Sequence, residues 1–122
     1  MSKLPALWWL PVGAAPEIKP ADLVRWLADG RRLQLIDSRT ALEYQQGTIG
    51  GARFAPLTGM PTSVADLNMD PEVPVVALCL TGHRSLPAVR WLRSKGYEAY
   101  SLSGGITAWK KAGFPLNNPE EP

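Results

Sequence analysis

Short apolar runs alternate along the chain between the spacing expected of helices and that expected of buried strands. Residues 20–28 begin with proline, gather apolar side chains on one side and end before Gly30, a pattern that predicts a helix. Further helices are predicted over 40–46, 63–67, 85–95 and 106–112. Strands are predicted over 33–37, 52–54, 75–79 and 97–102. This alternation predicts an α/β layer structure around a parallel sheet.

Length and composition fit one globular domain. With 122 residues, of which 45% are hydrophobic and 20% charged, the chain can form a hydrophobic core but is short for two domains. The formal net charge is only +2, so we expect no nucleic-acid partner, which would require a concentrated basic surface. A single cysteine and a single histidine exclude a disulfide framework and a metal cluster built from those residue types.

No segment of the sequence predicts a membrane span. The longest stretch without charge, residues 4–16, is interrupted by prolines, and a spanning helix needs about 20 apolar residues. The same prolines, and the lack of a clear small-residue cleavage site, argue against a secretory signal. We therefore expect a cytoplasmic, reducing compartment.

Cys79, the only thiol, is the last residue of the most apolar predicted strand and precedes a helix that begins near residue 85. Ligands of open α/β sheets bind at the carboxyl ends of strands, where backbone N–H groups and helix dipoles favour negative charge and hence a reactive thiolate. Gly82 permits a tight turn, and Arg84 can bind an anion through its guanidinium group. The alternative is an inert cysteine that packs as a small hydrophobic side chain.

Four segments resemble, in order, signatures of the rhodanese-like sulfurtransferases. Residues 79–85, Cys-Leu-Thr-Gly-His-Arg-Ser, resemble that family's active-site loop. Residues 37–44 resemble its Asp-x-Arg-x-x-x-Glu-aromatic signature, and residues 47–52 are similar to its Gly-His-Ile-x-Gly-Ala turn. Residues 102–115 resemble its C-terminal Gly-Gly-x-x-Ala-Trp signature. Each motif alone is weakly specific, whereas four in order indicate this family.

The resemblance implies a three-layer α/β/α fold with a central, mostly parallel sheet of about five strands. It divides the chain into an N-terminal arm, 1–16, a rhodanese-like domain, 17–116, and a flexible tail, 117–122. It also implies persulfide chemistry, in which Cys79 takes the outer sulfur of thiosulfate or a similar small anionic donor. Cyanide, a thiol or a protein partner then accepts that sulfur. No metal or organic cofactor is expected, because the sulfur is carried covalently.

The resemblance also assigns roles to the residues around Cys79. The outer sulfur is expected to lie in a ring of backbone N–H groups from the active-site loop, which comprises Leu80, Thr81, Gly82, His83, Arg84 and Ser85. Arg84 would position the anionic donor. Position rather than resemblance gives the roles of three further residues. Asp37 and Arg39 lie at the end of another predicted strand, at the same sheet edge, so together with Glu43 they are expected to brace the loop, and the spacing of four between Arg39 and Glu43 suits an ion pair on the predicted helix.

Two residues depart from the family pattern. Thr48 stands where a histidine is usual, and Lys19 where a serine or threonine often caps the first helix. Neither lies in the active-site loop, so we expect a cost in local stability rather than lost chemistry.

Two other functions fit the same scaffold. A phosphatase or arsenate reductase would use a loop one residue longer, whereas arginine here follows the cysteine by five positions. A non-catalytic binding module usually lacks the cysteine, which is present here. Outside the resemblance, Trp8 and Trp9 predict either an arm that packs over the domain or a dimer or partner contact.

Overall fold

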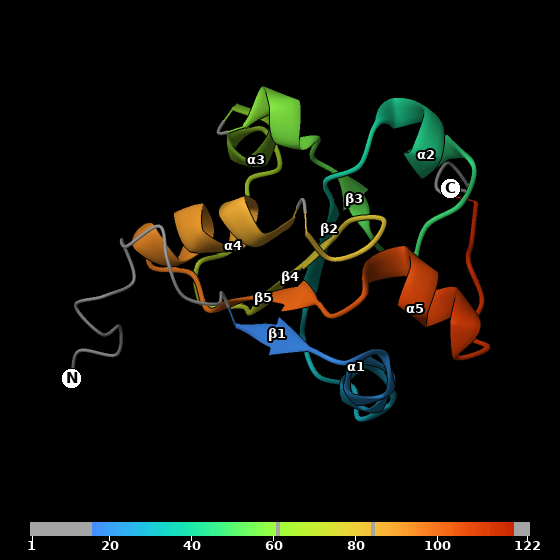
Figure 1. Cartoon of the computed structure of the whole chain (residues 1–122). Helices are drawn as coiled ribbons and strands as arrows, with labels where there is room; N and C mark the ends of the chain where they lie inside the picture. Colours follow the sequence, from blue (N-terminus) through green and yellow to red (C-terminus); the bar gives the residue numbers. More distant parts are fainter. Residues whose placement is uncertain (1–15, 61, 84, 119–122) are drawn as a thin grey trace.

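Five parallel strands form a single sheet in the computed structural model, which describes residues 16–60, 62–83 and 85–118. The strands lie in the order β1-β5-β4-β2-β3, and every pairing between neighbours is parallel (Figure 1). Their bounds are β1 Glu17–Ile18, β2 Gln34–Asp37, β3 Arg53–Phe54, β4 Val75–Leu78 and β5 Ala99–Leu102. The expected sheet of five strands is confirmed, and it is entirely rather than mostly parallel.

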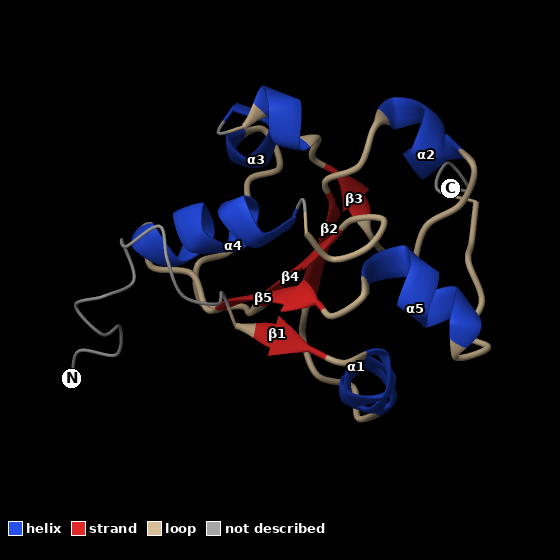
Figure 2. Cartoon of the chain, viewed as in Figure 1, coloured by secondary structure: helices blue, strands red, loops and turns tan. Residues whose placement is uncertain are grey.

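Helices cover both faces of this sheet. Their bounds are α1 Pro20–Ala28, α2 Ala41–Gln45, the 3-10 helix η1 Leu57–Gly59, α3 Thr62–Ala65, α4 Ser85–Ser94 and α5 Gly105–Lys111. Helices α3 and α4 lie on one side of the sheet, and α1 and α5 lie on the other (Figure 2). This arrangement confirms the three-layer α/β/α fold. None of the helices in the described part of the chain is long and apolar enough to cross a bilayer.

Alternate residues of β4 point into two separate hydrophobic cores. Val75 and Ala77 pack in the cluster that contains residues of α3 and α4, whereas Val76 and Leu78 pack in the cluster that contains residues of α1 and α5. All four side chains are fully buried. A central strand covered on both faces needs such an unbroken apolar run. The two cores therefore fix the end of β4, where Cys79 follows.

The structure differs from the sequence-based expectation at the end of one strand and in the presence of another. The strand predicted over 75–79 ends at Leu78, so Cys79 is the first residue of the active-site loop rather than the last of the strand. Strand β1 was not predicted. It pairs with β5 over only two residues, Glu17 with Ser101 and Ile18 with Leu102. Such a short segment has no recognisable periodicity.

The structure leaves the predicted division into arm, domain and tail untested. Trp8 and Trp9 lie outside the described residues, so the predicted arm or partner contact stays a prediction. At the other end, Asn117 forms an antiparallel bridge with Thr48 through two backbone hydrogen bonds of 2.6 and 3.0 Å. As expected for a lysine, the side chain of Lys19 makes no capping hydrogen bond to α1. Pro20 is the first residue of that helix.

Candidate active site

Cys79 lies at the carboxyl edge of the sheet with its sulfur facing the loop that follows it. The backbone N–H of Gly82 donates a hydrogen bond to Sγ at 2.9 Å. The hydroxyl of Ser85 is a second donor, with Oγ 3.4 Å from Sγ. The residue is 0% exposed, so the loop closes over the sulfur in this conformation. The thiol is therefore both buried and hydrogen-bonded by the loop, which sets it apart from a cysteine surrounded only by apolar side chains.

Helix α5 fixes the orientation of the first peptide groups of the active-site loop. The backbone N–H of Ile106 donates to the carbonyl of Cys79 at 2.8 Å, and that of Thr107 donates to the carbonyl of Leu80 at 2.9 Å. The C=O and N–H of a trans peptide point in opposite directions. The N–H groups of Leu80 and Thr81 therefore point away from α5. Two amides at the start of this helix thus hold the loop carbonyls back and leave loop N–H groups for an anion.

Glycines make this close approach between the loop and α5 sterically feasible. Gly82 has φ +95°, and a Cβ on it would lie 2.9 Å from the backbone nitrogen of Gly104. Gly105 has φ +62°, and its Cβ would lie 2.5 Å from the carbonyl oxygen of Leu80. Real Cβ atoms do not come so close to backbone atoms, so either side chain would displace the loop. Gly105, the second residue of the Gly-Gly pair in the C-terminal signature, therefore permits the close contact between α5 and the active-site loop.

A pair of buried hydroxyls lies behind the sulfur. Ser85, at the start of α4, and Ser101, on β5, have their Oγ atoms 2.6 Å apart, and both residues are 0% exposed. Each Oγ is also 3.4 Å from the carbonyl oxygen of Gly82. Ser101 was not among the predicted site residues. Its signal was a single polar residue within a short, otherwise hydrophobic strand.

Asp37 is the centre of a buried polar network beside the loop. Arg39 donates to both carboxylate oxygens of Asp37, through Nε at 2.9 Å and Nη2 at 2.8 Å, and its Nη2 also donates to the carbonyl of Gly47 at 2.6 Å. The hydroxyl of Thr48 donates to Asp37 Oδ2 at 2.7 Å. Asp37 is 0% and Arg39 5% exposed, so these contacts satisfy charges that burial would otherwise penalise. Thr48 thus supplies a hydrogen-bond donor at the position where the family usually has histidine.

The predicted ion pair between Arg39 and Glu43 is wrong. Arg39 precedes the N-cap Thr40 and lies outside the helix, so helical i,i+4 spacing does not apply to it. Its guanidinium pairs with Asp37. Glu43 completes the predicted capping box of α2, where its carboxylate accepts a hydrogen bond from the backbone N–H of Thr40 at 3.0 Å.

Ser38, between the two network residues, contacts the end of β4. Its backbone N–H and its hydroxyl both donate to the carbonyl of Leu78, at 2.8 and 2.7 Å. This carbonyl belongs to the residue immediately before Cys79. Ser38 was not among the predicted site residues, because a serine between two charged residues carries no distinctive signal. The link from the Asp37 network to the loop therefore runs through Ser38.

The outer part of the loop faces solvent. Leu80 is 40% exposed, and Thr81 and His83 are also exposed. The Thr81 hydroxyl and Nδ1 of His83 lie 3.2 Å apart. Arg84 lies outside the described residues, so its role in binding the donor stays a prediction.

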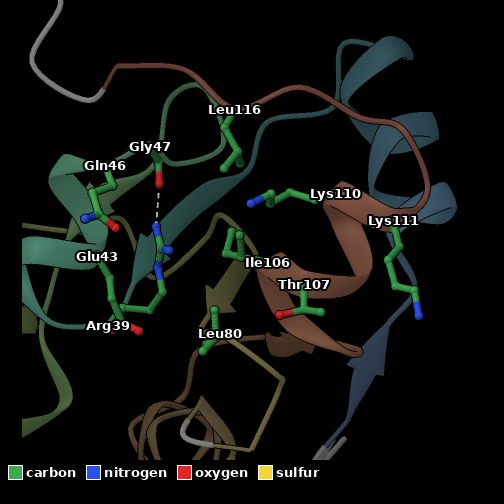
Figure 3. A pocket seen from close by; sticks show the side chains of 10 residues that line it. All are labelled: Arg39, Glu43, Gln46, Gly47, Leu80, Ile106, Thr107, Lys110, Lys111 and Leu116. Atoms are coloured by element: carbon green, nitrogen blue, oxygen red, sulfur yellow. Dashed lines mark hydrogen bonds between the residues drawn. The ribbon is translucent and has the colours of Figure 1, made fainter.

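A pocket of about 370 Å³ opens beside the loop, between the end of α2 and helix α5 (Figure 3). Leu80 of the active-site loop lines it, together with Ile106 and Lys110 of α5 and Leu116 beyond that helix. Arg39 lines the opposite side and points its guanidinium toward Gly47. The pocket therefore adjoins the residue next to the thiol.

Comparison with known proteins agrees with this geometry. The model of the rhodanese-like domain matches residues 19–112, which include Cys79, the active-site loop and the Asp37 network. The chain belongs to the rhodanese-like domain family. A sulfurtransferase of Allochromatium vinosum is 36% identical over 105 residues, covering 85% of this chain and 96% of that protein. These similarities support sulfurtransferase-family activity for this rhodanese-like domain.

Other relatives carry the domain within longer proteins. A tRNA uridine(34) hydroxylase of Bordetella parapertussis is 38% identical over 99 residues, which cover 77% of this chain and 41% of that protein.

Among solved structures, a rhodanese-like domain protein from Staphylococcus aureus is 25% identical with a TM-score of 0.73, covering 84% of this chain and 98% of that one. A rhodanese-related protein from Thermoplasma volcanium, 24% identical, has a TM-score of 0.75 over 84% of this chain and 97% of that one. The last similarity shows the shared fold.

Proposed function

We propose that this rhodanese-like domain transfers a sulfane sulfur from thiosulfate or a similar donor to a thiophilic acceptor through a persulfide on Cys79. The observation that carries the proposal is the 2.9 Å hydrogen bond from the Gly82 N–H to the only thiol of the chain. The loop carbonyls of Cys79 and Leu80 are held by α5, which leaves the adjacent N–H groups for a second anionic atom. An inert core cysteine needs neither feature.

In the first half-reaction, the Cys79 thiolate attacks the outer sulfur of thiosulfate. A bond forms between Sγ and that sulfur, the sulfur–sulfur bond of thiosulfate breaks, and its electron pair leaves with sulfite. The product is a persulfide whose terminal sulfur carries the negative charge. Because Cys79 is 0% exposed, the reaction includes a displacement of the exposed outer loop that admits the donor.

In the second half-reaction, the acceptor attacks the terminal sulfur, and the Cys79 thiolate leaves with the electron pair of the persulfide bond. The chain has no second cysteine, so the persulfide is not resolved as an internal disulfide and the acceptor comes from outside the chain. Cyanide, a small thiol or a thiol of a partner protein meets this requirement. A reducing compartment, which we propose for this chain, keeps the thiol available.

A non-catalytic binding module is the second candidate, and the complete burial of Cys79 favours it. A phosphatase receives less support, because arginine follows the cysteine by only five positions and the loop contacts the sulfur at 2.9 Å. Such a ring leaves little room for a tetrahedral phosphoryl group.

Steady-state kinetics with thiosulfate and cyanide separate these candidates. The sulfurtransferase proposal predicts thiocyanate formation with parallel double-reciprocal plots, which indicate a ping-pong mechanism, and predicts its loss in Cys79→Ser. The substitution is nearly isosteric, so the urea unfolding midpoint should change little. Full thiocyanate formation by Cys79→Ser would refute the proposal, whereas a folded wild-type protein with no turnover would favour the binding module. Hydrolysis of p-nitrophenyl phosphate would favour the phosphatase.

A further inference from the structure

We propose that the pocket beside the active-site loop binds the sulfur acceptor, and that this acceptor is a small organic thiol whose carboxylate is held by Lys110. The proposal rests on the proposed function and names the class of acceptor. In this proposal, the apolar side chains of the pocket contact the carbon skeleton of the acceptor, and Lys110 binds its carboxylate.

The pocket and the thiol are connected through α5. Thr107, whose N–H holds the carbonyl of Leu80, lines the pocket three residues before Lys110. Residues three apart lie on the same helix face, and the rise of about 1.5 Å per residue places them roughly 4.5 Å apart along the axis. The backbone of Lys110 thus lies about one helical turn beyond Thr107, whose N–H holds the loop. Figure 3 shows the side chain of Lys110 extending into the space between Leu116 and Arg39.

Two lysines line this pocket, Lys110 and Lys111, and Figure 3 shows Lys110 extending toward Arg39 while Lys111 extends away from it. Among the described lining residues, Lys110 is therefore the cation we assign to the ligand. Arg39 is already paired with Asp37 at 2.8 Å. Glu43, the carboxylate at the same pocket, accepts hydrogen bonds from both the backbone N–H and the hydroxyl of Thr40. Within the described part of the chain, Lys110 takes part in no ion pair.

The size and walls of the pocket indicate an organic ligand. A volume of about 370 Å³ falls in the range of small-molecule sites, and a thiosulfate ion would fill only a small part of it. Leu80, Ile106 and Leu116 contribute apolar surface, which suits the carbon skeleton of a thiol better than an inorganic anion. Cyanide would gain nothing from such a site.

The chemical step balances without a further reactant. The thiol sulfur of the acceptor attacks the terminal sulfur of the Cys79 persulfide, and the bond between that sulfur and Sγ breaks. The electron pair of the broken bond returns to Sγ, which takes up the proton of the acceptor thiol. The acceptor leaves as a persulfide anion.

Two acceptors with the same thiol and carbon skeleton test the pocket, namely N-acetylcysteine, which carries a carboxylate, and its uncharged carboxamide. Because the carboxylate also changes the reactivity of the thiol, the diagnostic quantity is how each variant changes the ratio of their kcat/KM values. With saturating thiosulfate, sulfite release gives kcat/KM for each acceptor. We expect Lys110→Gln to lower kcat/KM for N-acetylcysteine about threefold to fivefold, the range for one exposed charge pair, and to change the value for the carboxamide by less than about twofold. Lys110→Arg should retain the preference for the carboxylate. Lys95→Gln removes an exposed lysine on the α4 side of the sheet and is the matched control, with no expected change.

The outcomes separate this proposal from the one on which it rests. An unchanged ratio of the two kcat/KM values in Lys110→Gln, whether through an equal loss for both acceptors or no loss for either, would overturn the acceptor pocket while leaving persulfide transfer intact. If neither thiol nor cyanide supported sulfite release from thiosulfate, the proposed function itself would be contradicted. A preference for the carboxylate that weakens at high salt would support the pocket, because exposed charges are screened.

Discussion

Gly105→Ala is the substitution that most directly perturbs the contact between α5 and the active-site loop. A Cβ at this position would press on the carbonyl oxygen of Cys79 and lie 2.5 Å from the carbonyl oxygen of Leu80. Both are backbone atoms, which cannot turn aside as a flexible side chain can. The loop must therefore move away from the helix, and the hydrogen bonds from Ile106 and Thr107 lengthen or break.

The magnitude follows from three contributions. The left-handed backbone at Gly105, with φ +62°, costs about 1–2 kcal/mol for an L-residue. The two hydrogen bonds, of 2.8 and 2.9 Å, contribute about 1 kcal/mol each. The lower entropy of the unfolded alanine chain returns about 0.5 kcal/mol. We expect the free energy of unfolding to fall by about 3 kcal/mol.

Gly30→Ala is the matched control, because Gly30 has φ +75° and a Cβ there would meet nothing within 4 Å. It should lower the free energy of unfolding by only about 1 kcal/mol and leave sulfur transfer unchanged. Urea titration followed by tryptophan fluorescence gives the free energies, and thiocyanate formation gives the activity. Equal destabilisation by the two substitutions, with activity retained in Gly105→Ala, would refute the role assigned to α5.

Three further substitutions test other parts of the account. Thr48→Val removes the 2.7 Å hydrogen bond to the buried carboxylate of Asp37 and should lower the free energy of unfolding by about 2 kcal/mol in urea titrations; an unchanged value would contradict the network. Ser85→Ala removes a hydroxyl donor from Cys79 Sγ and should lower kcat/KM for thiosulfate about fivefold, whereas wild-type kinetics would show that this contact does not matter. The pKa of Tyr100 is raised above its ordinary 10.0, first because the side chain is partly buried and next because its hydroxyl donates a hydrogen bond to Glu98. The folded state therefore keeps the phenolic proton at a pH where the unfolded state has lost it. Stability should therefore fall as pH rises above about 10, and Tyr100→Phe should flatten this part of the stability curve; an identical curve would remove Tyr100 from the effect.

The sheet could be predicted from the sequence because its central strands carry strong local signals. Residues 75–78 are all apolar, and burial on both faces of a parallel sheet requires that. The capping box of α2 could also be predicted, because Thr40 and Glu43 are only three positions apart in the sequence. Strand β1 left no such signal, because its two residues are held by backbone hydrogen bonds to β5 that any residue types could make.

The site was predicted in outline and not in its contacts. Cys79 and the loop were recognised from their order along the chain, while the partners that hold them are distant in sequence. Thr48 contacts Asp37 across 11 positions, and Ser101 contacts Ser85 across 16. Helical spacing predicted that Arg39 pairs with Glu43. It pairs with Asp37 instead, because leaving that fully buried carboxylate without a cation would cost more free energy than leaving a more exposed one.

Intact-mass spectrometry after incubation with thiosulfate tests the central claim most directly, because it detects the sulfur carrier without requiring an acceptor. We expect the wild-type chain to gain the mass of one sulfur atom, added cyanide to remove it, and the Cys79→Ser chain to gain nothing. A wild-type chain that stays unmodified, or a Cys79→Ser chain that gains the same mass, would contradict the claim that the amide-lined loop makes Cys79 the carrier.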